Sequence, residues 1–405
     1  MLARIGRSLL AAVLGLLVLA AAAQAADPLP KAISMSGPQP LREDNHPNDY
    51  RSWGNRQYFK DSHTAWVKLW VSWYDLQQAY AATSRDGSWN NLTGSATGSA
   101  YLKRLDGQIR AANDDGVRTV VTIYQAFPTW ATGATGQDPL SSKGAERKLP
   151  SNLTMNGPWA WFVGYLSARY NGAYNATGPH KPAKRETTSA YYGNSSRAKV
   201  DAIEVVNEPN TLYWPLDNIV GATATMMRTA ATISSQWGKQ TIVAPATSDS
   251  PDPGAARPGV SMDWQAFTSQ LLTALAGWRP PVPVEWSQHN YKDVKYEDPA
   301  STSRAKQTID LLHAASWPNP ELWLTEGGYN LGSAWADAAA RDAQAAKIQK
   351  SYEAMRTLPE VTMWTQHGIN DIGSNSFKSG LRDDFDYALP GPGSARPAWA
   401  TWLGL

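Results

Sequence analysis

The sequence predicts an α/β fold of the (β/α)8 TIM-barrel class. Eight strand-type runs are bounded by turn residues, and most are rich in Val, Ile, Trp and Thr without strict alternation. This pattern is typical of strands buried on both faces. Helical patterns lie between the runs, and the last four runs begin roughly 40 residues apart, which is the length of one β–α unit. An open doubly wound sheet is the alternative, but no GxGxxG motif follows the first run.

The predicted strands are, in chain order, Ala32–Met35, Trp66–Val71, Arg118–Tyr124, Ala202–Val206, Gln240–Pro245, Val284–Gln288, Glu321–Thr325 and Val361–Thr365. Between the second and third strands, residues 101–114 place four apolar side chains on one helical face. Residues 159–170, before the fourth strand, and residues 335–358, before the eighth, are equally periodic. Pro397 fits the first turn of a closing helix, because its fixed φ suits that position.

Two long connections rich in Gly, Asn and Ser flank the helix that follows the third strand. They are Ala131–Pro158 and Asn171–Ala198. We expect both to be surface insertions, the first at the rim of the active site. No second domain, internal repeat or long linker stands out, so residues 26–405 are predicted to form one catalytic domain.

Residues 1–25 are predicted to be a secretory signal peptide. Arg4 and Arg7 precede an apolar run from Leu9 to Ala23, and Ala23-Gln24-Ala25 is a small-x-small cleavage site. An N-terminal membrane anchor is the alternative. No other stretch reaches the roughly 18 apolar residues of a membrane-spanning helix. We therefore expect a secreted protein, extracellular or periplasmic, with no membrane association after cleavage.

The composition excludes several classes of partner. The chain has no cysteine, so its stability must come from the core rather than from disulfides. Without the two arginines of the signal, 35 basic residues balance 35 acidic ones, which argues against nucleic acid as a partner. The chain has 19 Trp and 17 Tyr but only 6 Phe, and rings with a polar edge suit partly apolar, hydroxylated ligands. More than half of these rings are expected to pack between helices and barrel, and we expect a monomer.

Two glutamates follow predicted strands at positions that a barrel brings together. Asn207-Glu208-Pro209 ends the fourth strand, because proline cannot donate a ladder hydrogen bond. The seventh strand ends at Glu326, directly before two glycines. The two glutamates are 118 residues apart, about three β–α units, and the carboxyl ends of barrel strands share one mouth. We therefore expect their carboxylates to face each other across it.

Paired carboxylates are the groups that cleavage of a glycosidic bond requires. One protonates the departing oxygen, and the other attacks or stabilises the sugar cation. Two carboxyl groups held close together do not both ionise easily, which favours one of them as an acid. A helix cap or a salt bridge explains a lone Asn-Glu-Pro equally well, but neither explains the matched pair.

The sequence resembles the retaining glycoside hydrolases of the (β/α)8-barrel clan A over essentially the whole mature chain. The motifs are VNEPN at residues 206–210 and WLTEGG at residues 323–328, supported by WVKLWVSWYDLQ, FPTWA and FVGYLSARY. Families 39 and 5 are the most similar groups. The resemblance implies Glu208 as acid/base, Glu326 as nucleophile and Asn207 as the partner of the sugar 2-hydroxyl, a contact that tightens in the transition state.

Further site residues follow from the same resemblance. The motif SQHNY resembles the clan's His-x-Tyr element. It implies Tyr291 as the hydrogen-bond partner of the nucleophile, and His289 as a contact of the sugar or of the acid/base. Trp364 matches the clan's aromatic platform beneath the reacting sugar, although barrel packing explains a Trp there as well. Lys68 stands where many clan members carry an arginine, and as a point charge it either neutralises Glu326 or points elsewhere.

Three more tryptophans are candidates for stacking on further sugars, because they lie near predicted strand ends or in rim loops. They are Trp73, Trp130 and Trp214, and packing is the alternative for each. The six histidines show no HExxH spacing, and the chain has no GxSxG elbow and no P-loop. No metal or nucleotide chemistry is predicted.

These observations predict a secreted retaining glycosidase that needs no cofactor and acts on β-linked oligo- or polysaccharides. A transglycosylase on the same scaffold is an alternative, because the two differ only in whether water or a sugar reaches the intermediate. A catalytically silent carbohydrate-binding barrel is the third possibility. The sugar, the linkage and endo or exo action stay open.

Overall fold

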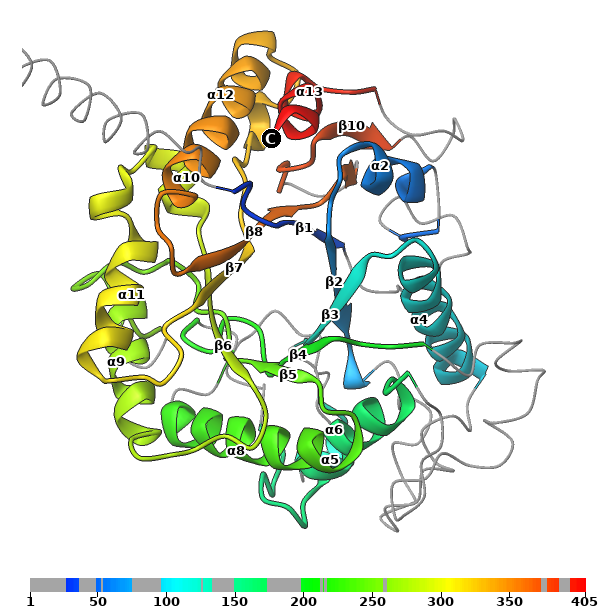
Figure 1. Cartoon of the computed structure of the whole chain (residues 1–405), viewed down its shortest axis with the longest axis vertical. Coiled ribbons are helices and arrows are strands. Elements are labelled where there is room, and N and C mark those ends of the chain that lie inside the picture. Colours follow the sequence, from blue (N-terminus) through cyan, green and yellow to red (C-terminus); the bar gives the residue numbers. More distant parts are fainter. Residues whose placement is uncertain are drawn as a thin grey trace, which may run out of the picture.

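The computed structural model of the chain is a closed barrel of eight parallel strands inside a ring of helices (Figure 1). Each strand pairs with the next one in the sequence, and β8 closes the ring on β1. The predicted (β/α)8 class is confirmed, and the open doubly wound alternative is wrong. The structure describes residues 27–35, 49–51, 54–74, 96–124, 127–132, 149–172, 198–211, 214, 217–257, 261–372, 377–385 and 394–405.

The barrel strands are β1 (Lys31–Met35), β2 (Trp66–Val71), β3 (Arg118–Ile123), β4 (Ala202–Glu204), β5 (Thr241–Val243), β6 (Val284–His289), β7 (Leu322–Glu326) and β8 (Val361–His367). All eight predicted strands are confirmed. β4 and β5 are shorter than predicted, but a single bridge between Asn207 and Ala246 continues their alignment towards the carboxyl end. β8 is two residues longer than predicted, so His367 is its last residue.

The helices are α2 (Asn55–Asp61), α4 (Ala96–Asp114), α5 (Thr129–Thr132), α6 (Pro158–Arg169), α8 (Ile219–Trp237), α9 (Trp264–Ala274), α10 (Tyr291–Tyr296), α11 (Arg304–Ala314), α12 (Ala338–Met355) and α13 (Pro397–Gly404), with 3-10 turns at Ala300–Thr302 and Gly332–Ala334. The three helices predicted from periodicity correspond to α4, α6 and α12. Pro397 begins α13, as expected. The sequence did not predict the small parallel sheet of β9 (Asn370–Ile372) and β10 (Arg382–Phe385).

An apolar layer fills the barrel interior toward the amino ends of the strands. Seven strands contribute one side chain each: Ala32, Trp66, Val120, Ala202, Val243, Trp323 and Met363. The rings of Trp66 and Trp323 meet edge to face with centroids 5.1 Å apart, and the Arg118 guanidinium lies 3.8 Å from the Trp66 ring centre. In β6 the residue in register with Val243 is Glu285. This layer closes the lower end of the barrel.

The next interior layer is polar. Side chains of a strand point alternately to its two faces, so the residue two positions further along returns to the barrel axis. In four strands these residues are Lys68, Thr122, Glu204 and Thr325. All four side chains are buried, and they hydrogen-bond or ion-pair with one another. The polar layer lies directly beneath the carboxyl ends of the strands, where the site is built.

Several predictions concern residues outside the described part of the chain. The predicted signal peptide, residues 1–25, lies there, and so does most of the two predicted insertions. Among the residues that the structure describes, no helix combines the length and apolarity needed to cross a membrane.

Candidate active site

Glu208 lies just beyond β4 in a backbone conformation that few residues with a side chain adopt. Its φ is 45°, in the left-handed region, and such strain is concentrated at functional sites. The Glu208 N–H donates to the main-chain oxygen of Ala246 at 3.0 Å, and the Thr211 N–H donates to the Glu208 oxygen at 3.1 Å. Its side chain keeps 18% of its surface exposed. The turn therefore lifts this carboxylate off the strand direction and toward the mouth.

Asn210 fixes the turn against the loop that follows β5. Its amide nitrogen lies 3.2 to 3.3 Å from the main-chain oxygens of Ser248, Ser250 and Met262, and its oxygen accepts from the Ser248 N–H at 2.9 Å. A side chain with so many main-chain partners holds one backbone geometry. The last residue of the VNEPN motif thus positions the glutamate two residues before it.

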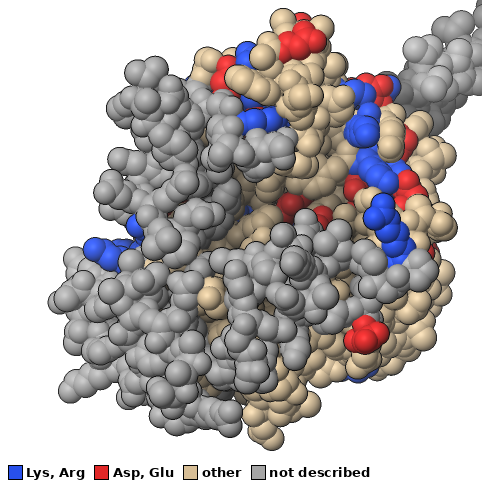
Figure 2. Space-filling model, turned by 180° about the vertical axis from the view of Figure 1, so that it is seen from behind, with Lys and Arg blue, Asp and Glu red and all other residues tan. Residues whose placement is uncertain are grey.

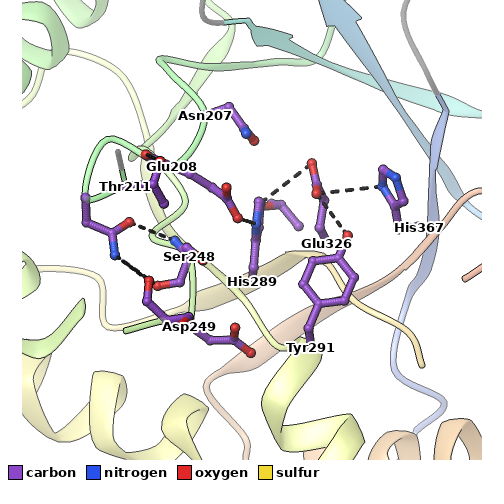
Figure 3. Close-up of polar contacts among 12 residues, drawn as sticks. Asn207, Glu208, Thr211, Ser248, Asp249, His289, Tyr291, Glu326 and His367 are labelled. Atoms are coloured by element: carbon purple, nitrogen blue, oxygen red, sulfur yellow. Dashed lines mark hydrogen bonds and ion pairs between the residues drawn. The ribbon is translucent and has the colours of Figure 1, made fainter. Parts of the chain in front are cut away.

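Glu326 ends β7 and is almost completely buried, with 5% of its side chain exposed. Four side chains contact its carboxylate, and Figure 3 labels three of them, His289, Tyr291 and His367. Lys68 Nζ lies 2.9 Å from Oε1, and the Tyr291 hydroxyl donates to Oε2 at 3.1 Å. His289 Nε2 and His367 Nδ1 are each 3.7 Å from a carboxylate oxygen. The nucleophile candidate is thus held from several sides by cationic or hydrogen-bonding groups.

The two glycines after Glu326 are required by the local geometry. A Cβ at Gly327 would lie 1.9 Å from the Asn290 side chain, and Gly328 has φ at 125°, a value that side chains rarely permit. The main-chain N–H of Asn290 donates to the Glu326 main-chain oxygen at 2.9 Å, and this bond holds the Asn290 side chain next to Gly327. Its amide, oriented to satisfy its neighbours, also donates to that oxygen and accepts from Trp364 Nε1, both at 3.0 Å. Asn290 therefore anchors the main chain of the nucleophile candidate.

His289 joins the two glutamates. It ends β6 and is fully buried, with Nδ1 2.8 Å from Glu208 Oε1 and Nε2 3.7 Å from Glu326 Oε1. One imidazole ring therefore contacts both carboxylates, which face it from opposite sides (Figure 3). The sequence prediction that strands four and seven bring these groups together across the mouth agrees with this arrangement. On the face of the molecule seen in Figure 2, acidic side chains are visible inside a hollow.

The electrostatics of the site favour an ionised Glu326. Burial alone would raise the pKa of its carboxyl, but the charges of His289, Lys68 and His367 outweigh burial and lower this pKa to about 2. Burial lowers the pKa of His289, but the neighbouring Glu326 and Glu208 carboxylates raise it above its ordinary value. Burial and these carboxylates raise the pKa of Tyr291 well above its ordinary value, so its hydroxyl stays a donor.

Lys68 is the cation of a buried network. Of the two alternatives for this residue, it pairs with Glu326 and does not point elsewhere. Its Nζ lies 2.8 Å from Glu204 Oε2 as well as 2.9 Å from Glu326. The Glu204 carboxylate also accepts from three hydroxyls, those of Thr122, Ser287 and Thr325, at 2.5, 3.1 and 2.7 Å. Burial lowers the pKa of Lys68, but the two carboxylates outweigh burial and raise it. The lysine therefore stays charged against Glu326.

Asn207 is positioned through its main chain. Its main-chain oxygen accepts from Trp214 Nε1 at 2.9 Å, and the residue as a whole is 3% exposed. Among the side chains that the structure describes, its Oδ1 is one of the buried polar atoms without a hydrogen-bond partner. Such an atom is available to a ligand hydroxyl, which fits the role that the resemblance implied.

The structure does not place Trp364 where a sugar platform requires it. Within β8 the side chains of Met363, Thr365 and His367 alternate with that of Trp364, so its ring points away from the barrel axis. It is fully buried and packs on Tyr352 and Trp402, with ring centroids 5.9 and 5.5 Å away. The platform prediction is corrected accordingly, because the packing alternative describes this residue.

The three tryptophans proposed for further sugars are not confirmed as stacking residues. Trp73 is fully buried and stacks on Phe162 with centroids 4.4 Å apart, and Trp214 is 3% exposed beside Phe127. Both are packing residues. Trp130 lies on α5, and its side chain is outside the described residues.

Sequence reasoning missed Glu204, His367 and Trp70. Strand parity could have found them, because each lies an even number of positions from another axis-facing residue of its strand. His367 is two residues beyond Thr365, and Trp70 is two beyond Lys68. The structure also shows no group of three or more His, Cys, Asp or Glu side chains arranged for a metal within its described ranges.

No protein-family model and no curated protein sequence matches the chain. Solved structures do match. A glucosidase from Croceicoccus marinus aligns over 93% of this chain and 67% of its own length, with 13% identity and a TM-score of 0.57. A hyperthermophilic β-glucosidase from Pyrococcus furiosus aligns over 93% and 94%, with 11% identity and a TM-score of 0.55. The chain has the fold of these glycosidases.

A family 39 glycoside hydrolase from Bacteroides cellulosilyticus WH2 is also similar, with 12% identity and a TM-score of 0.52. The alignment covers 94% of this chain but only 64% of that protein, so this chain spans less than two thirds of its length. At these identities the likeness establishes the shared barrel fold.

Proposed function

We propose that this chain is a secreted retaining glycosidase that cleaves β-linked glycans through a covalent glycosyl-enzyme. The observation that carries the proposal is the His289 ring between Glu208 and Glu326, at the ends of β6, β4 and β7. Two carboxyl groups that contact the two nitrogens of one imidazole are placed to act on one glycosidic bond, and the buried, ionised Glu326 suits the role of nucleophile. The glycosidase fold of the solved neighbours supports the same reading.

In the first step, Glu208 donates its proton to the glycosidic oxygen while a carboxylate oxygen of Glu326 attacks the anomeric carbon. The bond from that carbon to the leaving oxygen breaks, and an ester to Glu326 forms. The low pKa of Glu326 keeps the attacking group ionised, and Lys68 and Tyr291 keep it oriented. Asn207 is the proposed partner of the sugar 2-hydroxyl.

In the second step, Glu208 takes a proton from water, whose oxygen attacks the anomeric carbon and releases Glu326. Two inversions restore the configuration of the substrate. If a sugar hydroxyl replaces water, the same intermediate gives transglycosylation. The ionised nucleophile beside a second carboxylate favours a reactive site over a silent sugar-binding barrel.

A mechanism-based label tests the proposal most directly. A 2-deoxy-2-fluoro β-glycoside with a dinitrophenolate leaving group should form the ester but release it slowly, because fluorine destabilises the sugar cation. Mass spectrometry of the digest should find the added sugar on the peptide that contains Glu326. Glu326→Ala should fold normally, take no label and lose nearly all turnover on a panel of aryl β-glycosides.

NMR of the first wild-type product supplies the second readout. Retention of the anomeric configuration is expected. An inverted first product, or a label on a different residue, would overturn the assigned roles. The panel of glucosides, mannosides, galactosides and xylosides identifies the preferred sugar in the same experiment.

A further inference from the structure

His367 is the last residue of β8 and faces the same carboxylate as the catalytic residues. Its Nδ1 lies 3.7 Å from Glu326 Oε2, the oxygen that already accepts the Tyr291 hydroxyl. Figure 3 shows its imidazole on the side of Glu326 away from His289. The double displacement described above assigns no step to this ring, although 21% of its side chain is open to solvent.

The hydrogen-bonding capacity of His367 toward the nucleophile is unused. Its Nδ1 is buried and has no hydrogen-bond partner, and the same holds for His289 Nε2 and Asn207 Oδ1. All three atoms belong to residues drawn around the two glutamates in Figure 3. Buried polar atoms are normally satisfied, so several unsatisfied ones around one carboxylate indicate where the hydroxyls of a ligand are received.

Aromatic rings surround His367 on its other sides. The centroids of Phe377, Trp70 and Tyr291 lie 5.7, 5.9 and 6.2 Å from the centroid of the imidazole. Trp70 ends the axis-facing series of β2 and is only half-buried, and its Nε1–H donates to Ser34 Oγ at 3.2 Å, which fixes the ring. A fixed, partly open indole beside a hydrogen-bonding imidazole offers an apolar wall and a polar contact to one sugar ring.

A neutral imidazole fits a hydroxyl better than it fits a charged group. Burial lowers the pKa of His367, and the Lys68 and His289 charges lower it further, although Glu326 and Glu208 oppose this. A neutral ring can donate or accept through Nδ1, as a sugar hydroxyl also can. Because Nδ1 lies 3.7 Å from an oxygen of the Glu326 carboxylate, a hydroxyl that it receives belongs to a carbon near the anomeric centre.

We propose that His367 is a specificity-determining residue that hydrogen-bonds the hydroxyl on carbon 2 or carbon 3 of the sugar attacked by Glu326, with Trp70 as the apolar wall of that subsite. The inference rests on the proposed glycosidase function. It assigns to this pocket a neutral, hydroxyl-bearing sugar ring.

A double-mutant cycle, in which enzyme variants are combined with deoxy substrates, tests the proposed hydrogen bond between His367 and the sugar hydroxyl. The enzymes are the wild type, His367→Phe, which keeps a flat ring without nitrogen, and His367→Asn, whose amide can place a polar atom near the position of Nδ1. The substrates are the dinitrophenyl β-glycoside that the wild type prefers and its 2-deoxy and 3-deoxy analogues. The measured quantity is kcat/KM for each pair.

For the parent substrate, His367→Phe should lower kcat/KM by about 10-fold or more, the usual worth of a hydrogen bond. For one of the deoxy analogues, the same substitution should have almost no effect, because the hydroxyl is already absent. His367→Asn should recover part of the loss on the parent only. Trp70→Ala should weaken all three substrates alike, because stacking does not distinguish one hydroxyl.

His313→Phe is the matched control, since His313 is half exposed on α11 and pairs with Glu360 away from the site. It should leave kcat/KM unchanged. Equal losses for His367→Phe on all three substrates would overturn the proposed contact and leave the glycosidase proposal intact. If the wild type turns over no aryl β-glycoside faster than Glu326→Ala, the glycosidase proposal fails, and the role of His367 fails with it.

Discussion

Lys68 and Glu326 form a buried ion pair between strands β2 and β7, with Nζ 2.9 Å from Oε1. Only 2% and 5% of the two side chains are exposed. An ion pair so far from solvent is screened little by salt, and it strongly favours the ionised carboxylate. Lys68 therefore adds to the charges of His289 and His367 in keeping Glu326 ionised.

Removing the Lys68 charge should change the pH dependence of the reaction. The lysine lowers the pKa of Glu326, so Lys68→Met should raise it, and the acidic limb of the kcat/KM profile should move up by at least about one pH unit. Activity requires the ionised nucleophile and is lost as pH falls through this pKa. We expect kcat/KM at neutral pH to fall about 100-fold, measured with an aryl β-glycoside. Between about pH 3 and pH 8, the acidic limb should enter the window for the variant, whereas that of the wild type lies below it.

Two further variants separate this electrostatic effect from misfolding. Lys68→Met leaves Glu204 as an unpaired buried carboxylate, which costs about 3–5 kcal/mol of folding free energy. Combining Lys68→Met with Glu204→Gln removes both charges and should restore folding but not activity. Lys68→Arg should keep the acidic limb low. An acidic limb that stays in place in the folded double variant would contradict the role of Lys68.

Glu208→Ala should fail in a way that depends on the leaving group. Dinitrophenyl glycosides need little protonation, so the first step should survive within about 10-fold, while alkyl glycosides should lose about 1,000-fold or more. Added azide needs no general base, so it should intercept the glycosyl-enzyme and give a β-glycosyl azide, detected by NMR. Glu326→Ala should give no such product. Equal losses for both classes of substrate, without azide rescue, would remove Glu208 from the acid/base role.

Trp364 should matter for stability more than for sugar binding. Trp364→Ala leaves a cavity between β8, α12 and α13 and should cost about 3–5 kcal/mol in the free energy of unfolding, measured with urea. Trp364→Phe fills most of the space but removes the indole N–H that Asn290 accepts, so kcat should fall modestly. KM should change little in either variant. A raised KM with unchanged stability would instead indicate that Trp364 stacks on the sugar.

Glu285 should make the protein less stable as the pH rises. It lies within the apolar lower layer of the barrel, and burial, followed by Glu321, raises its pKa to about 7. Its pKa in the unfolded chain is about 4.3, so the folded state binds the extra proton between these values. The stability that this proton provides is complete below about pH 4 and is lost as the pH rises to about 7. The expected loss is on the order of 2 kcal/mol.

Glu285→Gln should flatten this dependence. The variant keeps a group that Asn319 Nδ2 can contact, at the position where it now donates to Glu285 Oε2 at 3.1 Å. Wild type and variant should have similar unfolding free energies at about pH 4, and the variant should be the more stable at about pH 8. Parallel curves across this range would show that Glu285 does not hold its proton in the folded state.

The barrel fold and the positions of Glu208 and Glu326 after two of its strands could be predicted from the sequence, because both depend on local patterns. The strand runs and Pro209 identify the segment in which the chain leaves the fourth strand, although β4 itself already ends at Glu204. In a closed barrel this segment and the end of β7 lie at the same mouth. The Trp364 platform was wrong for a reason that parity explains. Strand eight continues to His367, and counting back by two places Trp364 on the outer face.

Other features required the three-dimensional structure. The sequence shows Lys68 on a strand, but whether it pairs with Glu326 depends on the tilt and register of β2, β7 and β4 together. In the sequence, Glu204 is one polar residue in an apolar run. Only the structure shows that its carboxylate pairs with Lys68 and accepts hydrogen bonds from three hydroxyls. The small β9–β10 sheet has strands too short for a periodic signal.

The apolar lower layer of the barrel, with Trp66 and Trp323, limits the directions from which molecules can reach the site. Trp66 and Trp323 close the barrel beneath the polar layer, so the axis is not a second passage for water or product. Within the part of the chain that the structure describes, the lower end of the barrel is closed, so Glu326 is approached from the carboxyl ends of the strands. In the proposed double displacement, the leaving sugar would have to clear this opening before water could attack the ester on Glu326. On the same proposal, a sugar that stays at this opening would compete with water for the intermediate, and its occupancy would set the ratio of hydrolysis to glycan transfer.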